Sequence, residues 1–252
     1  MIKQTLSSNR SKKGDIKAFD RNAKERNAAW VNRALADFKL SDLSAWSFVL
    51  LTGSTDVASF RLRVAQSHFR ADMLPSYWSD CLLLQTKKNS LHSFYHIPLL
   101  QPATASFAPL RNGVVQSTLS KLPDADSMPN LALLAIPVAE QDTISALQQF
   151  QHNRAAVDAL ALLLPWLGFC WGTDNSSNPL LQQLPLPSAQ MIQLLFSSVC
   201  FDLTPGVNTD LAAPEAFWSG IKHWQHFYSQ TQQPGASLPK ARYVLGHGYD
   251  IS

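Results

Sequence analysis

The segment from Pro185 to Gly206 constrains the fold most, because it has the pattern of a helix that must be buried. It reads PLPSAQMIQLLFSSVCFDLTPG, with prolines before the helical part and a Thr-Pro-Gly turn after it. Met191, Leu195 and Val199 recur four apart, which is typical of the apolar face of a helix. Ser188 stands where the residue that caps a helix start is expected, so its ordinary interpretation is an N-cap.

The composition predicts a globular chain with a sizeable core. The 252 residues are 46% hydrophobic and 15% charged, which fits one large domain or two small ones. A net charge of +3 is too small to indicate nucleic acid. We find no signal peptide, no run long and apolar enough for a membrane span, and no phosphate or dinucleotide loop. The cysteines Cys81, Cys170 and Cys200 show no metal spacing and are expected to be reduced, as in a cytoplasmic, bacterial-type protein.

Charge and polarity divide the chain into three parts. Residues 1–26 are polar and basic, and we expect a flexible arm that is either solubilising or a docking tail for an acidic partner. Residues 27–229 carry the apolar patterns of the folded domain. Residues 230–252 are expected to be a linker followed by either a short strand or a tail that docks elsewhere.

Within the folded domain, the apolar patterns predict a mixture of helices and strands. The run Leu131 to Val138 is apolar throughout, which indicates a strand buried on both faces. We expect an α+β fold, with a small antiparallel sheet packed by helices. The expected helices are 27–40, 59–73, 142–163, the one that starts near Ser188, and 214–228; the expected strands are 46–52, 77–84, 91–99, the end of 107–119, and 131–138.

Two stretches carry a resemblance to a known family. Pro-Ser-Ala-Gln-Met-Ile-Gln-Leu-Leu-Phe is followed by Phe-Asp-Leu-Thr-Pro-Gly, and Trp-Ser-Phe-Val-Leu-Leu-Thr-Gly is followed by a helix and Tyr-Trp-Ser-Asp-Cys-Leu-Leu-Leu. They resemble the catalytic segments of the permuted papain-like (NlpC/P60-type, YiiX-like) cysteine hydrolases. The resemblance covers roughly Trp46 to Trp224. It implies a permuted papain-like fold and a reaction at amide or ester bonds.

The same resemblance implies that the catalytic residues have changed. Ser188 occupies the position of the nucleophilic cysteine, and Asp80 occupies that of the histidine base. His96 lies roughly where the family places its orienting polar residue. A serine is a weak nucleophile unless a base activates it, and an aspartate is a poor base towards a hydroxyl. We therefore expect a catalytically inactive domain that binds or scaffolds a protein partner.

Two alternatives stay open. Asp80, His96 and Ser188 have the three chemical types of a serine hydrolase, although the nucleophile-elbow motif Gly-x-Ser-x-Gly is absent. The chain could instead be an interaction subunit that docks through its basic arm or its aromatic helix 214–228.

Two further kinds of site follow from residue types. Basic residues of the helix 59–73, with a nearby tryptophan, are candidates for a binding face; these are Arg61, Arg63, Arg70 and Trp78. Pairs of histidines lie at 92 and 96 and at 223 and 226, but no carboxylate or cysteine joins them at metal-ligand spacing. We therefore expect neither a metal nor a cofactor.

Overall fold

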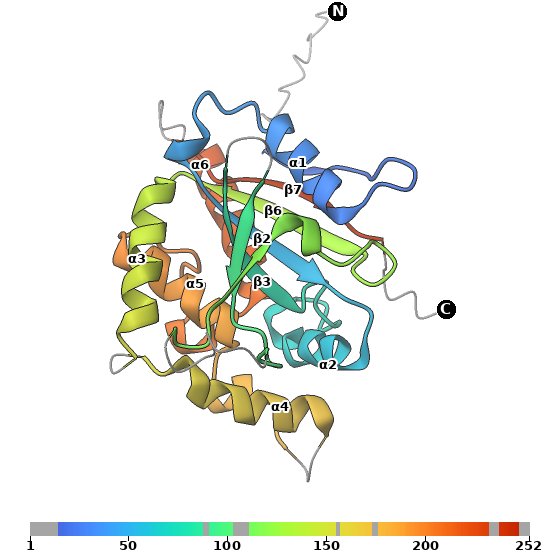
Figure 1. The fold of residues 1–252 in the computed structure, drawn as a ribbon, viewed down its shortest axis with the longest axis vertical. Helices are drawn as coiled ribbons and strands as arrows, with labels where there is room; N and C mark the ends of the chain where they lie inside the picture. Colours follow the sequence, from blue (N-terminus) through green and yellow to red (C-terminus); the bar gives the residue numbers. More distant parts are fainter. Residues whose placement is uncertain are drawn as a thin grey trace, which may run out of the picture.

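The computed structural model describes residues 15–87, 91–102, 111–154, 157–172, 176–231 and 237–246. A seven-stranded sheet in the order β1-β7-β6-β2-β3-β4-β5 runs through the molecule (Figure 1). Neighbouring strands are antiparallel, except that β1 and β7 are parallel. The strands are β1 (Ile16–Ala18), β2 (Ser47–Gly53), β3 (Asp80–Gln85), β4 (Ser93–His96), β5 (Val115–Thr118), β6 (Asn130–Ile136) and β7 (Lys240–Val244).

Helices cover both faces of this sheet. Side chains of α1 pack with Phe48, Leu50 and Leu133 on one face. Side chains of α3, α5 and α6 pack with Val49, Leu51 and other residues of the opposite face. The helices are α1 (Asn27–Asp37), α2 (Val57–Ala65), α3 (Glu140–His152), α4 (Leu163–Trp171), α5 (Pro187–Ser198) and α6 (Pro214–Thr231). The α+β class expected from the sequence is confirmed.

Alternation along the strands explains why two cores form. Successive strand side chains point to opposite faces, so Phe48 and Leu50 join the α1 core while Val49 and Leu51 join the other. All seven residues of β6 are buried, which confirms the prediction of a strand covered on both faces.

The helix expected over 142–163 is two helices. α3 ends at His152, and Asp158 then caps a short 3-10 turn by accepting a hydrogen bond from the Leu160 amide. α4 starts at Leu163, which places Pro165 in its first turn. A proline has no amide hydrogen and is tolerated in that turn, so Pro165 is compatible with a helix that starts at Leu163. The predicted helix 142–163 was wrong because α3 ends at His152, eleven residues before the predicted end. The basic helix is also shorter than expected, because α2 ends at Ala65.

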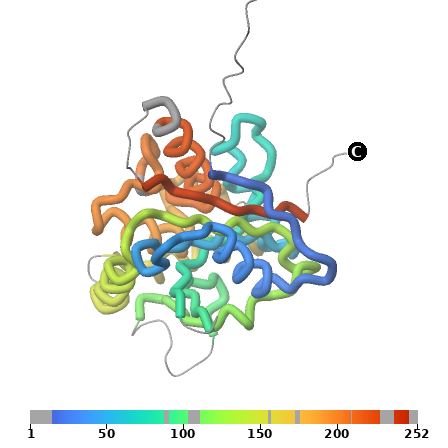
Figure 2. Tube along the Cα trace, turned by 90° about the horizontal axis from the view of Figure 1, so that it is seen from above, coloured from blue at the N-terminus to red at the C-terminus, as the bar shows by residue number. Residues whose placement is uncertain are grey.

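The last strand lies inside the sheet, between β1 and β6. Figure 2 shows the first described residues (blue) running beside β7 (red). Ile16 pairs with Ala241, so part of the predicted flexible arm is a strand, and the terminal-strand alternative for the last segment holds at 240–244. Residues 1–14 of that arm, and residues 247–252, lie outside the described residues.

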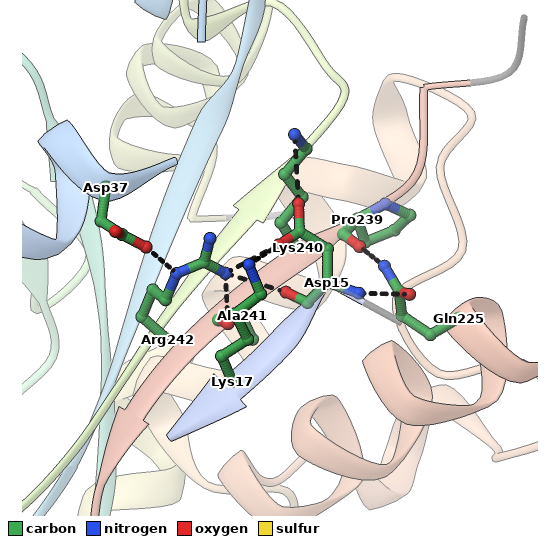
Figure 3. Close-up of polar contacts among 8 residues, drawn as sticks. All are labelled: Asp15, Lys17, Asp37, Gln225, Pro239, Lys240, Ala241 and Arg242. Carbon is green, nitrogen blue, oxygen red and sulfur yellow. Dashed lines mark hydrogen bonds and ion pairs between the residues drawn. The ribbon is translucent and has the colours of Figure 1, made fainter. Parts of the chain in front are cut away.

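A buried arginine links these terminal strands to α1 (Figure 3). The Arg242 side chain is 2% exposed, and its Nε donates to Asp37 Oδ2 at 2.5 Å. Its Nη1 lies 3.0 Å from Asp15 Oδ1 and donates to the carbonyl oxygen of Asp15. The guanidinium also stacks over Phe38 at 4.8 Å. One side chain therefore connects β7, the start of β1 and the end of α1.

Candidate functional site

Ser188 lies inside the first turn of α5 and does not cap it. Leu186 is the N-cap residue and Pro187 is the first helical residue, a place where a proline needs no amide donor. The Ser188 hydroxyl instead faces the chain that leaves β4. It accepts a hydrogen bond from the Ile97 amide at 3.1 Å and donates one to the Ile97 carbonyl at 3.3 Å. The expected N-cap role was wrong, because the helix starts two residues earlier.

Asp80 and His96 form a pair, as the serine-hydrolase alternative expects. The hairpin of β3 and β4 brings the start of one strand beside the end of the other. His96 Nδ1 lies 3.2 Å from Asp80 Oδ2, and Asp80 Oδ1 accepts from the Cys81 amide at 2.8 Å. An ionised carboxylate only accepts hydrogen bonds, so Nδ1 carries the hydrogen and Nε2 of the neutral ring is an acceptor.

The Asp80–His96 pair faces the side of the sheet opposite to α5. Leu82 and Phe94, each two residues away along its strand, belong to the core under α1. Cys81 and Ile97, the chain neighbours of Asp80 and His96, belong to the core that contains α5. Ser188 is therefore on the Ile97 side of β4. Both of its described hydrogen bonds go to the Ile97 backbone, and none goes to the imidazole.

Ser188, Asp80 and His96 nevertheless border one pocket, of about 340 Å³, at the end of the central strands. α2, the start of α5 and the segment 122–128 close it. Most of its walls are apolar. The lining residues are Thr52, Ser54, Ala58, Ser59, Leu62, Ser79, Asp80, Leu82, Phe94, His96, Ile97, Pro98, Leu99, Leu100, Leu122, Pro123, Met128, Leu186, Pro187 and Ser188.

The four residues predicted as a basic binding face do not form one. Arg63 is 3% exposed and its Nε donates to the Ser76 carbonyl, and Trp78 is fully buried. Arg70 pairs with Asp72 at 2.5 Å and stacks over a tyrosine. Arg61 donates to the Phe169 carbonyl at 2.9 Å. Arg61 and Arg63 join α2 to its neighbours, and Arg63 and Trp78 are too deeply buried for the predicted binding face, which we correct accordingly.

The buried cysteines are not reactive. Full burial raises the pKa of the Cys81 thiol well above its usual value, and the neighbouring Asp80 carboxylate adds to this rise in pKa. Burial raises the pKa of Cys170 to about 11. Thiolate is the nucleophilic form of cysteine, so neither side chain offers a reactive nucleophile near neutral pH.

Most of the pocket wall could not be predicted from the sequence. Ala58, Leu62, Leu122 and Met128 come from segments far apart in the chain and carry no chemical signature. The sequence does show that Asp80 shares its strand parity with Leu82, a residue of the α1 core. That parity becomes informative only once the helix covering each face is known.

Two searches within the described part of the chain bear on site type. No group of three or more His, Cys, Asp or Glu side chains lies close enough there to hold a metal ion. Among the same residues, none of the helices has the length and apolar character that crossing a bilayer requires.

The fold and the pocket define an α+β protein with an apolar pocket that carries an Asp–His pair. A scan of family models, a search of curated proteins and a search of solved structures each gave no match.

Proposed function

We propose that this chain is a non-catalytic binding protein, built like a permuted papain-like hydrolase, whose pocket at the end of the central strands holds a ligand. One observation carries the proposal: the Ser188 hydroxyl is engaged with the Ile97 backbone. Ser188 is 2% exposed, so it has little contact with solvent or with a substrate.

A serine nucleophile needs a base within hydrogen-bond reach of its hydroxyl. The strand parity places His96 on the other face of β4, and the hydroxyl hydrogen is donated to Ile97. A reaction at Ser188 would first have to break that hydrogen bond and expose a buried group. The Asp80–His96 pair is thus a polar feature of the pocket wall rather than part of a charge-relay arrangement.

The pocket itself supports binding. Its volume of about 340 Å³ lies within the range of small-molecule sites, about 300–1,000 Å³. Apolar walls give affinity, and a few polar groups fix the orientation of a ligand. The wall has both kinds of residue, for example Leu82 and Met128 beside Asp80. That the ligand belongs to a protein partner, and that the protein is cytoplasmic, stay predictions from the sequence.

Filling the pocket tests the binding function. Ala58 lines the pocket from α2, and an Ala58→Trp substitution places an indole in this space. Ala29→Trp, at an exposed position of α1 outside the lining, is the matched control. We expect a small-molecule library to contain compounds that raise the thermal midpoint of the wild type and of Ala29→Trp but not of Ala58→Trp. Compounds that stabilise all three proteins equally would contradict the proposal.

The serine-hydrolase alternative is kept because Asp80, His96 and Ser188 border the same pocket. It predicts that a fluorophosphonate probe labels Ser188 in the wild type and that His96→Ala removes the labelling. Our proposal predicts an unlabelled wild type after overnight incubation, as judged by intact-protein mass spectrometry. A single phosphonyl adduct on Ser188 would decide for the hydrolase.

A further inference from the structure

The charges around the pocket restrict the ligand further. Among its described lining residues, Asp80 and His96 are the ones with an acidic or basic side chain, and no lysine or arginine is present. The described lining therefore offers one carboxylate and one imidazole, and no ammonium or guanidinium group.

Polar groups gather at one end of this wall. Thr52 pairs with Asp80 across β2 and β3, and Ser79 Oγ donates to the Thr52 carbonyl. The Ser54 amide donates to Ser79 Oγ at 3.3 Å. Asp80 is 33% exposed, and each of its carboxylate oxygens has one described partner, so lone pairs are left to accept from a ligand.

We propose that the pocket selects a small organic cation, an ammonium group on a short apolar or arylalkyl body. The ammonium donates to the Asp80 carboxylate, and the apolar body lies along Leu82, Met128 and the rest of the aliphatic wall. This inference rests on the proposed binding function and names the ligand class of the same pocket.

An anion is disfavoured at this site. No positively charged side chain of the described lining pairs with it, and the Asp80 carboxylate repels it. A neutral alcohol fits the apolar walls but gains a weaker hydrogen bond than a charged donor. Phe94, whose ring meets the His96 ring edge-on at 5.4 Å, adds an aromatic group that favours a cation over an anion.

Three probes of similar shape test the ligand class: 2-phenylethylammonium, 2-phenylethanol and phenylacetate. Their dissociation constants are measured by ligand-observed NMR near neutral pH on the wild type, Asp80→Asn and Asp56→Asn. Asp56 caps α2 by accepting from the Ser59 amide, a role that asparagine also fills, and it does not line the pocket.

We expect the ammonium probe to bind the wild type and Asp56→Asn about tenfold more tightly than the alcohol, with no measurable binding of phenylacetate. Asp80→Asn should weaken the binding of the ammonium probe until its dissociation constant equals that of the alcohol. Should Asp80→Asn not fold, the order of the three probes on the wild type still decides.

Equal binding of ammonium and alcohol, or tighter binding of phenylacetate, would overturn the cation inference and leave the binding pocket in place. Failure of all three probes overturns the cation inference as well. If library compounds then still distinguish Ala58→Trp from Ala29→Trp, the binding function survives that result. If they do not, the proposed function fails too.

Discussion

The Ser188 hydroxyl serves as both hydrogen-bond donor and acceptor for the backbone of one residue, Ile97, just after the end of β4. A buried amide without a partner is costly, and here the Ile97 amide depends on a side chain of another element. The residue that the family resemblance assigns to catalysis is thus explained by structure. Its place at the start of α5 ties that helix to the end of β4.

We therefore predict that Ser188→Ala destabilises the fold by about 1–3 kcal/mol, since it leaves the Ile97 amide unpaired in the interior. Urea denaturation gives the free energy of unfolding. Ser67→Ala is the control, because the Ser67 hydroxyl bonds the Val64 carbonyl at the surface and its loss should cost under about 0.5 kcal/mol. Equal stability of Ser188→Ala and the wild type would contradict the hydrogen-bonding role.

Glu215 gives a prediction for pH. This side chain is 2% exposed and accepts a hydrogen bond from the Ser76 hydroxyl at 2.7 Å. Burial raises its pKa, while Ser76, Lys222 and Arg70 oppose the rise in pKa and Asp72 adds to it. Because its pKa is raised in the folded state, Glu215 contributes its full stabilisation of the fold below the unfolded-state pKa. This stabilisation is lost as pH rises through the folded-state pKa.

Glu215→Gln keeps an acceptor for Ser76 and has no proton to lose. Relative to the wild type, we expect it to become progressively more stable as pH rises from about 4 towards neutrality. Urea midpoints of both proteins across that range give the difference. A difference that stays constant with pH would show that burial of this carboxylate does not limit stability.

At the scale of elements, α6 approaches the loop before it so closely that one helical position must be glycine. A methyl group at Gly220 would overlap the carbonyl oxygen of Leu203. Alanine normally favours a helix over glycine by about 1 kcal/mol. Here the overlap with backbone should dominate, because the loop cannot move without disturbing the buried Leu203.

We predict that Gly220→Ala lowers the free energy of unfolding by about 1–3 kcal/mol. Ser219→Ala, one residue earlier on α6 and half-exposed, should be neutral or slightly stabilising. Thermal and urea denaturation of the two variants compare the effects directly. Stabilisation by both substitutions would mean that the helix and loop move apart readily.

The elements also show what a sequence can predict. Period and alternation placed β2, β3, β6, α5 and α6 close to their observed bounds, because these segments are long and strongly patterned. They did not place the break at Asn153, where the apolar pattern continues although the helix ends. The hairpin that brings Asp80 and His96 together is seen only in the structure. Period and alternation could not separate Ser188 from His96, because that depends on which helix covers which face.

At the scale of the whole molecule, the Arg242 contacts join segments from both ends of the described chain. The first cause of the lowered Asp37 pKa is its hydrogen bond with the Arg242 guanidinium. Because the pKa of Asp37 is lowered, its ionised carboxylate stabilises the fold fully above the unfolded-state pKa. This stabilisation is lost as pH falls through the folded-state pKa. The contacts should therefore weaken in acid.

Arg242→Ala should destabilise the protein by about 2–3 kcal/mol near neutral pH, since it leaves Asp37 without its guanidinium partner and empties a buried site, while Asp15 keeps its ion pairs with Lys17 and Lys240. Arg242→Lys keeps the charge but not the planar guanidinium, so its free energy of unfolding should lie between those of the wild type and Arg242→Ala. The loss of stability caused by Arg242→Ala should be smaller in acid, where Asp37 is protonated. Denaturation of the three proteins at neutral and acidic pH tests this, and a loss independent of pH would exclude Asp37 as the important partner.

The position of β7 has a consequence for the order in which the chain assembles. Ile16 finds its partner Ala241 only after nearly all of the described chain has left the ribosome. Until then β6, a strand that is apolar from Leu131 to its end, has an open edge where β7 will lie. Such an edge invites pairing with other chains, and contacts so distant in sequence form slowly. Nascent chains that stall before residue 240 should therefore depend on chaperones far more than the finished protein does.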